Sequence, residues 1–193
     1  MDNQSTRCKI GKVRFSYLHV FTPRAQEGSE PKYSVTLIIP KSDTALLEAI
    51  KAAITNAFNG GIGKFGGKLP AKGTWKNPLR DGDVERPEDE AFAGCYFINA
   101  SSKTKPGVVK WGANGQLVDI TNEDELYSGC YGYASVNFFP FNNSGNKGIA
   151  CGLNNILKTD NGDYLGGRSS AKSDFGDMTP QPVNDSPEGD DIF

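Results

Sequence analysis

The alternation of apolar and polar positions near the N-terminus predicts two β-strands. Residues 9–21 and residues 32–39 both repeat with a period of two, which places successive side chains on opposite faces of a strand. In the first segment Val13, Phe15 and Tyr17 share the expected core face, while the residues between them are polar. Pro40 ends the second segment, since proline cannot continue the hydrogen bonding of a central strand.

A stripe of apolar residues with helical spacing follows these strands. Between Ala45 and Phe58 apolar positions recur every three or four residues, and Asn59-Gly60-Gly61 then ends the predicted helix. Strand-like segments resume at residues 94–101, 107–111, 129–141 and 147–157. About six strands and one helix, without internal repeats or βαβ alternation, indicate a mainly β fold and disfavour a parallel α/β fold.

The segment 129–141 is the most informative of these strands. Its even positions, from Cys130 to Phe138, are small or apolar and suit a buried face. Its odd positions carry four aromatic and two hydrogen-bonding residues, namely Tyr131, Tyr133, Ser135, Asn137, Phe139 and Phe141. If the even set faces the core, the odd set faces away from it, and an exposed aromatic stripe indicates a ligand. The alternative is that the helix or a long insertion covers these rings.

Residues 60–90 predict a long irregular insertion, because glycine and proline are frequent in its first part. A basic residue recurs at every fourth position from Lys64 to Arg80, so we interpret this part as a mobile basic loop around Trp75. Two interpretations remain open. In the first, the loop is a basic arm whose Trp75 stacks on a ligand. In the second, it is a solvent-exposed loop that is attached to the body of the domain by the packing of Trp75.

Few residues suit catalysis. His19 is the only histidine, and neither a nucleophile elbow nor a phosphate-binding glycine loop occurs. His19 is therefore expected to be an ordinary strand residue. The remaining candidates are Asp81, Asp83 and Glu85, which could in principle collect Mg²⁺, although the neighbouring proline and glycine favour a solvated loop. We expect no catalytic residue, no cofactor and no bound metal.

The length and the lack of apolar runs also limit the class of protein. A chain of 193 residues suits one domain with appendages. No run approaches the ~18 apolar residues of a membrane helix, and the first ten residues lack the apolar middle of a signal peptide, so we expect a cytosolic protein. In a reducing compartment the four cysteines should be thiols, with a Cys130–Cys151 disulfide as the less favoured alternative.

The charge of the chain is divided between its body and its C-terminal end. The net charge is -2, from 21 basic and 23 acidic residues, but residues 174–193 hold six acidic and no basic groups. Residues 1–173 therefore carry a net charge of +4. The terminal segment cannot bury enough apolar area to offset its ordering entropy, so we predict one domain over residues 1–173 and a disordered acidic tail over residues 174–193.

Four longer segments are distinctive. They are PKYSVTLIIPKSDTALLEAI (31–50), LYSGCYGYASVNFFPF (126–141), GIACGLNNIL (148–157) and TDNGDYLGGRSSAKSDF (159–175). Together they resemble a family of tailed-phage proteins, formerly a domain of unknown function and now understood as single-stranded DNA-binding proteins with an OB fold. The resemblance implies a five-stranded Greek-key barrel, here with an inserted helix, a long loop insertion and the acidic tail. The helix and the insertion depart from a minimal barrel.

The resemblance implies a protein that coats single-stranded DNA during phage genome replication or recombination, in the cytoplasm of the infected bacterium. Aromatic rings would stack on bases and cations would neutralise phosphates. The candidate stacking residues are Tyr131, Tyr133, Phe139, Trp75 and Trp111, of which Trp111 could instead be a core residue. The candidate phosphate partners are Lys12, Arg14, Lys32, Lys72, Lys76, Lys103, Lys105 and Lys110.

The end of the chain, Asp190-Asp191-Ile192-Phe193, is similar to the acidic, Phe-terminated tip with which other single-strand-binding proteins bind replication and repair partners. We expect the tail to compete with DNA for the cationic surface and to recruit such partners, with the protein a monomer or weak oligomer. Two alternatives from other classes remain. One is a metal-dependent nuclease using the acidic residues of the insertion, and the other is a structural phage protein whose aromatic stripe is a protein interface.

Overall fold

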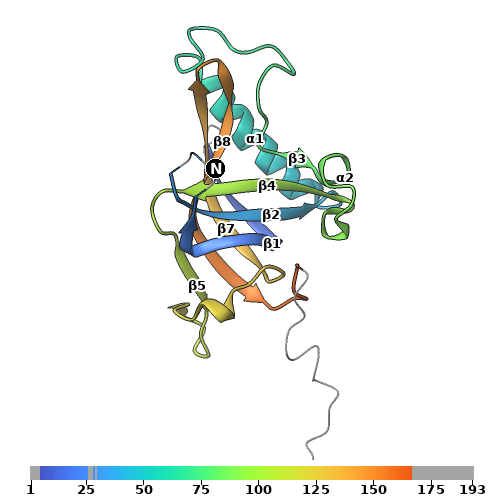
Figure 1. The fold of residues 1–193 in the computed structure, drawn as a ribbon, viewed down its shortest axis with the longest axis vertical. Helices are drawn as coiled ribbons and strands as arrows, with labels where there is room; N and C mark the ends of the chain where they lie inside the picture. Colours follow the sequence, from blue (N-terminus) through green and yellow to red (C-terminus); the bar gives the residue numbers. More distant parts are fainter. Residues whose placement is uncertain (1–4, 26–27, 29, 167–193) are drawn as a thin grey trace, which may run out of the picture.

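The computed structural model describes residues 5–25, 28 and 30–166, and it has a mainly β fold (Figure 1). Five strands form its body. They are β1 (Arg7–Arg24), β2 (Lys32–Pro40), β4 (Cys95–Ser102), β7 (Tyr131–Asn143) and β8 (Asn146–Asp160). Each coincides with a predicted strand to within about three residues at either end, as expected when alternation marks the strand and turns set its limits. The predicted acidic tail lies outside the described residues.

The order of these strands around the barrel identifies the fold. β1 pairs with β2 and with β7, β2 also pairs with β4, and β7 also pairs with β8, all of them antiparallel. The barrel closes where β4 and β8 run parallel, with Ala100 opposite Cys151 and Ser101 opposite Gly152. A Greek-key barrel whose third and fifth strands meet in this way is an OB fold. The structure confirms the fold that the resemblance implied.

Helix α1 (Thr44–Gly60) connects β2 to the insertion and packs against β1, β7 and β8 (Figure 1). The Asp43 side chain accepts a hydrogen bond of 3.1 Å from the backbone N–H of Leu46, which caps the helix. The predicted apolar stripe is buried in the core, through Leu47, Ile50, Ala53, Ile54 and Ala57. Within the described part of the chain, no helix combines the length and apolar character that crossing a bilayer requires.

The insertion between α1 and β4 has two parts of different character. Residues 61–79 form a succession of turns, as predicted. Residues 80–92, here called the inserted lobe, contain short regular elements and lie beside β4 (Figure 1). The lobe comprises β3 (Arg80–Asp81), α2 (Gly82–Glu85) and the 3₁₀ turn η1 (Glu90–Phe92). The prediction of irregular structure throughout residues 60–90 was therefore wrong for the lobe, because the carboxylates of Asp81 and Asp89 cap its helical turns.

A short extension continues the sheet beyond the barrel. It comprises β5 (Gly107–Trp111), β6 (Leu117–Asp119) and the 3₁₀ turn η2 (Glu123–Glu125). β5 runs parallel to β8 and antiparallel to β6. Val108 points inward and is buried, whereas Trp111 is 55% exposed. A core position for Trp111 is therefore excluded.

The four cysteines are free thiols, so the alternative of a Cys130–Cys151 disulfide is wrong. Cys130 and Cys151 are buried in the barrel, and burial raises the pKa of the Cys151 thiol. Cys8 and Cys95 are half-buried, and burial also raises the pKa of both thiols. These side chains act as small apolar residues of the core and its margin.

Candidate nucleic-acid interface

The aromatic stripe of β7 lies on the outside of the barrel. Its even positions are buried, and the odd positions point away from the core, as the period of two predicted. The rings of Tyr133 and Phe139 are 40% and 43% exposed. Neither α1 nor the insertion covers these two side chains, which answers the alternative of a second layer at these positions.

Glycines on the neighbouring strands make room for both exposed rings. A Cβ atom at Gly152 of β8 would lie 3.3 Å from Cε1 of Phe139, and a Cβ atom at Gly11 of β1 would lie 2.6 Å from Cδ1 of Tyr133. Each ring therefore rests on the backbone of an adjacent strand. Such support fixes the position of a ring without covering its outer side, which suits a stacking platform.

Two cations of β1, which the sequence analysis did not single out, share this face. Arg7 pairs with Asn137 and Lys9 pairs with Ser135, and residues directly opposite in a sheet point to the same side. Both cations are exposed. Their signal in the sequence was the same alternation that predicted the strand, but only the pairing of β1 with β7 places them beside the aromatic stripe.

The exposed ring of Trp111 belongs to the same outer surface. In the register of the sheet Tyr133 lies opposite Leu157, Leu157 lies beside Val109, and Trp111 follows two positions after Val109 on the same face of β5. The surface that we call the β7 face therefore runs across four strands. Its members are Arg7, Lys9, Tyr133, Ser135, Asn137, Phe139, Asn155, Leu157, Val109 and Trp111.

Tyr131 and Trp75 are less accessible than the rings of the β7 face. Tyr131 is half-buried beside Arg14, whose guanidinium carbon lies 5.6 Å from its ring centre, and Arg14 also donates a hydrogen bond of 2.8 Å to the carbonyl oxygen of Asp163. Trp75 packs on Phe58 of α1, with 4.7 Å between ring centres. The structure thus places Trp75 against the body, in the way that the second interpretation of the basic loop described.

Three of the candidate lysines are engaged in ion pairs. Lys12 lies 2.5 Å from Asp160, Lys103 pairs with Glu30, and Lys110 pairs with Glu125. The hydrogen bond from Lys12 lowers the pKa of Asp160, and the hydrogen bond from Lys103 lowers the pKa of Glu30. A phosphate would have to compete with a carboxylate for each of these ammonium groups.

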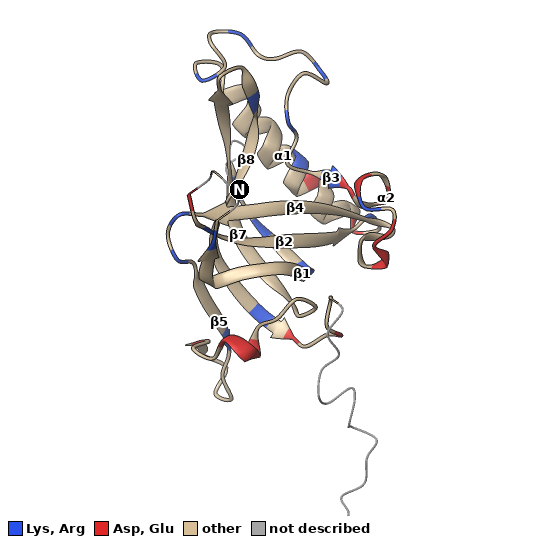
Figure 2. Cartoon of the chain, viewed as in Figure 1, with Lys and Arg blue, Asp and Glu red and all other residues tan. Residues whose placement is uncertain are grey.

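The other candidate lysines lie apart from one another. Lys72 and Lys76 are exposed in the turns before the lobe, where basic residues gather (Figure 2). Lys105 lies 5.9 Å from the ring centre of Phe21, and Lys32 begins β2. The acidic groups gather elsewhere, at the inserted lobe and at η2 (Figure 2).

A groove on the part of β1 that pairs with β2, away from β7, was not predicted. It is a cavity of about 720 Å³ on the outer face of β1, β2 and β4, the side on which OB folds bind oligonucleotides. Its lining includes the ring of Tyr17, the carboxylate of Glu30, and four side chains that are basic, namely His19, Arg24, Lys32 and Arg86. Of these only Lys32 was a candidate. The expectation that Tyr17 shares the core face with Phe15 was wrong, and His19, expected to be an ordinary residue of its strand, lies on β1 but lines the groove.

Polar side chains form the floor of the groove. Thr36 of β2 lies opposite Asn99 of β4, and its hydroxyl donates a hydrogen bond of 2.8 Å to Oδ1 of Asn99. Burial, and then the charge of Arg24, lowers the pKa of His19, so this imidazole is neutral at pH 7. The groove therefore offers hydrogen-bonding groups beside fixed positive charge, which is suitable for an anionic polar ligand.

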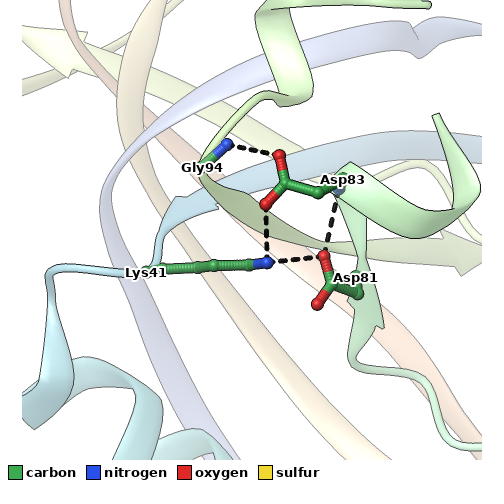
Figure 3. Close-up of polar contacts among 4 residues, drawn as sticks. All are labelled: Lys41, Asp81, Asp83 and Gly94. Atoms are coloured by element: carbon green, nitrogen blue, oxygen red, sulfur yellow. Dashed lines mark hydrogen bonds and ion pairs between the residues drawn. The ribbon is translucent and has the colours of Figure 1, made fainter. Parts of the chain in front are cut away.

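The acidic residues proposed for Mg²⁺ are occupied by a lysine. Nζ of Lys41 lies 2.6 Å from Oδ1 of Asp81 and 2.7 Å from Oδ2 of Asp83, and the other oxygen of Asp83 accepts a hydrogen bond of 2.8 Å from the N–H of Gly94 (Figure 3). These contacts lower the pKa of Asp83 and raise that of Lys41. Glu85 pairs with Arg80 instead. Among the described residues no cluster has the side chains of a metal site.

The fold and its outer faces define an OB-fold protein with aromatic and cationic surfaces. Residues 6–186 match the family model described as "Enterobacter phage Enc34, ssDNA-binding protein", and the chain belongs to this family. A curated relative, putative protein p50 of Acyrthosiphon pisum secondary endosymbiont phage 1, is 32% identical over 90% of this chain and 94% of its own length.

Solved structures agree with this assignment. The single-stranded DNA-binding protein from bacteriophage Enc34 in complex with ssDNA has a TM-score of 0.72 and 28% identity, over 83% of this chain and 90% of that chain. The single-stranded DNA-binding protein gp2.5 of bacteriophage T7 has a TM-score of 0.56 at 13% identity, over 91% of this chain and 96% of that chain, and so shares the fold. The expected membership in a phage single-stranded DNA-binding family is confirmed.

Proposed function

We propose that this protein coats single-stranded DNA in the infected bacterium, during replication or recombination of a phage genome, without chemistry of its own. Family membership and the relative solved with ssDNA support this function. The observation that carries it in this chain is the β7 face. There Arg7 and Lys9 lie beside the exposed rings of Tyr133 and Phe139, which is the combination that sequence-independent binding of unpaired bases needs.

The groove extends this binding surface around the barrel. β1 pairs with β7 through residues 7–14 and with β2 through residues 14–24, so one strand borders both faces. A single strand that occupies the groove can pass over β1 onto the β7 face. Along that path it meets rings for its bases and cations for its phosphates, whereas a duplex keeps its bases stacked inside and gains only the phosphate contacts.

The acidic tail is part of this proposal through its composition alone, since it lies outside the described residues. A tethered segment with six acidic groups stays at high effective concentration near the cationic surface and competes with DNA for it. DNA that displaces the tail frees Ile192 and Phe193 for replication or recombination proteins.

Fluorescence titration with oligo(dT) tests the proposed function, because Trp111 is exposed on the β7 face and reports binding there. We expect quenching that saturates, little dependence on base sequence, and weakening by about 0.7 log units per phosphate contact for each log unit of salt. The same titration with duplex DNA serves as the control. Lack of binding by the full chain at low salt would contradict the proposal and favour a structural role for the aromatic face.

A further inference from the structure

Tyr17 has an unusual backbone at the rim of the groove. Its φ angle is +47°, in the left-handed region that non-glycine residues rarely adopt. The pairing of β1 with β2 shifts register between Ser16 and His19, which marks a β-bulge. A bulge redirects the side chains that follow it, and here it turns the ring of Tyr17 outward until the side chain is 48% exposed. Residues held in such a conformation are concentrated at binding sites.

Arg86 holds the hydroxyl end of this ring. Its Nη1 donates a hydrogen bond of 3.0 Å to the Tyr17 hydroxyl, and its guanidinium carbon lies 5.2 Å from the ring centre. The same guanidinium lies 5.4 Å and 5.7 Å from the ring centres of Phe92 and Phe97, which are fully buried. Arg86 therefore rests on a packed aromatic base, so its own position is restricted.

The inserted lobe supplies Arg86 and is itself clamped. Lys41 at the end of β2 binds Asp81 and Asp83 on either side of the start of α2, and Asp83 also binds the backbone of Gly94 (Figure 3). Gly82 packs so closely that a Cβ atom would lie 2.4 Å from the carbonyl oxygen of Phe92. These contacts fix the four-residue helix α2, which ends at Glu85 and has Arg86 as its C-cap.

From this geometry we infer that Tyr17 is a stacking platform for one base of the single strand in the groove, and that Arg86 is the positioning residue that holds its ring. This inference rests on the proposed function and gives the inserted lobe a role in it. The Lys41–Asp81–Asp83 cluster then serves to place an arginine and not to bind a metal. The guanidinium of Arg86 lies against the ring of Tyr17 and donates to its hydroxyl, while Tyr17 stays 48% exposed at the groove, so a base can lie against the exposed part of the ring.

A set of variants separates stacking from charge. Replacing Tyr17 by Ala should weaken oligo(dT) binding about tenfold or more and leave the salt slope unchanged, because the change removes a stacking ring and no charge. Tyr17→Phe keeps the ring but removes the hydrogen bond from Arg86, and Arg86→Lys keeps the charge but removes the planar group that lies on the ring. Both should weaken binding by a smaller factor. Val84→Ala, at a residue of α2 that is 74% exposed, is the matched control and should bind as the wild type does.

A double-mutant cycle distinguishes positioning from a direct contact of Arg86 with phosphate. If Arg86 acts through Tyr17, Arg86→Lys has no further effect once Tyr17 is Ala. Additive effects would show that Arg86 acts independently and would overturn its positioning role. Thermal unfolding of each variant must match that of the wild type, and Tyr17→Leu provides a second test should Tyr17→Ala unfold early.

Photocrosslinking gives direct evidence for the platform. An oligonucleotide that contains 5-iododeoxyuridine should crosslink to Tyr17 in the full chain, and mass spectrometry locates the bond. If the wild type binds without a crosslink at Tyr17 and Tyr17→Ala keeps its affinity, the role of Tyr17 is overturned while the proposed function stands. Failure of the wild type to bind any single strand overturns the proposed function, and the inference with it.

Discussion

The hydroxyl of Thr36 donates a hydrogen bond of 2.8 Å to Oδ1 of Asn99, across the pair of strands that forms the floor of the groove. Asn99 is exposed and lines the groove, and because its Oδ1 is engaged in this way, its amide nitrogen is the group that can donate to a ligand. The exposed amide suits the carbonyl and ring-nitrogen acceptors of an unpaired base. This contact would add hydrogen bonding to the stacking that we assign to the rim.

Replacing Asn99 by Asp should weaken binding of single strands by about tenfold at low salt, since it places a negative charge where a donor group stood. Thr36→Val removes the bond that orients the amide and should weaken binding by a smaller factor. Fluorescence titration measures both. Asn154→Asp, an equal change at an exposed position of β8, is the control for the added charge alone. Equal reductions of affinity in the two Asp variants would show that Asn99 has no local role.

The rings of the β7 face give a second prediction. Replacing Tyr133 or Phe139 by Ala should reduce affinity about fivefold or more while leaving most of the salt slope, because the change removes stacking and not charge. Tyr131→Ala should have a smaller effect, since Arg14 and the segment near Asp163 cover that ring. Tyr164 stacks on Tyr127 with 3.9 Å between ring centres, so Tyr164→Ala is a control away from this face. Unchanged affinity of the Tyr133 and Phe139 variants would remove them from the site.

The cations of β1 should account for part of the salt dependence. Replacing Arg7 and Lys9 by Gln should lower the slope of log affinity against log salt by about 0.7 for each phosphate that is no longer neutralised. Lys51 is exposed on α1, so Lys51→Gln makes the same change in net charge at a distance from the face. Titrations at several salt concentrations measure the slopes. If Lys51→Gln changes the slope as much as Lys9→Gln does, net charge and not position governs the binding.

Much of the barrel could be predicted from the sequence, because alternation depends only on which side of a strand is buried. The same rule placed Tyr133 and Phe139 on the outer face correctly. It failed at Tyr17, since a bulge changes the side to which the next residues point, and no local pattern marked the bulge. It also missed Arg86, because its lobe is ordered by contacts between distant residues such as Lys41 and Asp83.

The ion pairs of individual lysines could not be predicted either, because they too depend on contacts between residues that are distant in the sequence. Lys12 and Asp160 are brought together by the pairing of β1, β7 and β8, and Lys110 meets Glu125 only because η2 folds back on β5. The sequence supported a cationic body, but whether a given ammonium group meets a carboxylate depends on tertiary structure. Arg7 and Lys9 became candidates only once the register of β1 against β7 was known.

His19 should make binding depend on pH. Burial lowers its pKa below the ordinary 6.5, so it is neutral at pH 7 and gains a proton only as the pH falls through the lowered pKa. A phosphate nearby favours the charged form, so affinity should rise as the pH falls from 7 to 5. The carboxylate that lines the groove, Glu30, should stay ionised over this range, because the hydrogen bond from Lys103 lowers its pKa from the ordinary value. His19→Gln should abolish this rise, and a rise that persists in the variant would assign it elsewhere.

The acidic tail should restrain binding to duplex DNA more than binding to single strands. Removing residues 174–193 takes away six acidic groups, so affinity for both kinds of DNA should increase. The increase should be larger for duplex, because single strands already gain stacking energy with which they displace the tail. Titrations with oligo(dT) and with a duplex of equal length measure the two ratios, and an unchanged preference for single strands would exclude tail competition. Phe193→Ala in the full chain is the matched control, since it keeps the six charges: it should leave DNA binding unaltered while abolishing capture of a partner that recognises the acidic, Phe-terminated end.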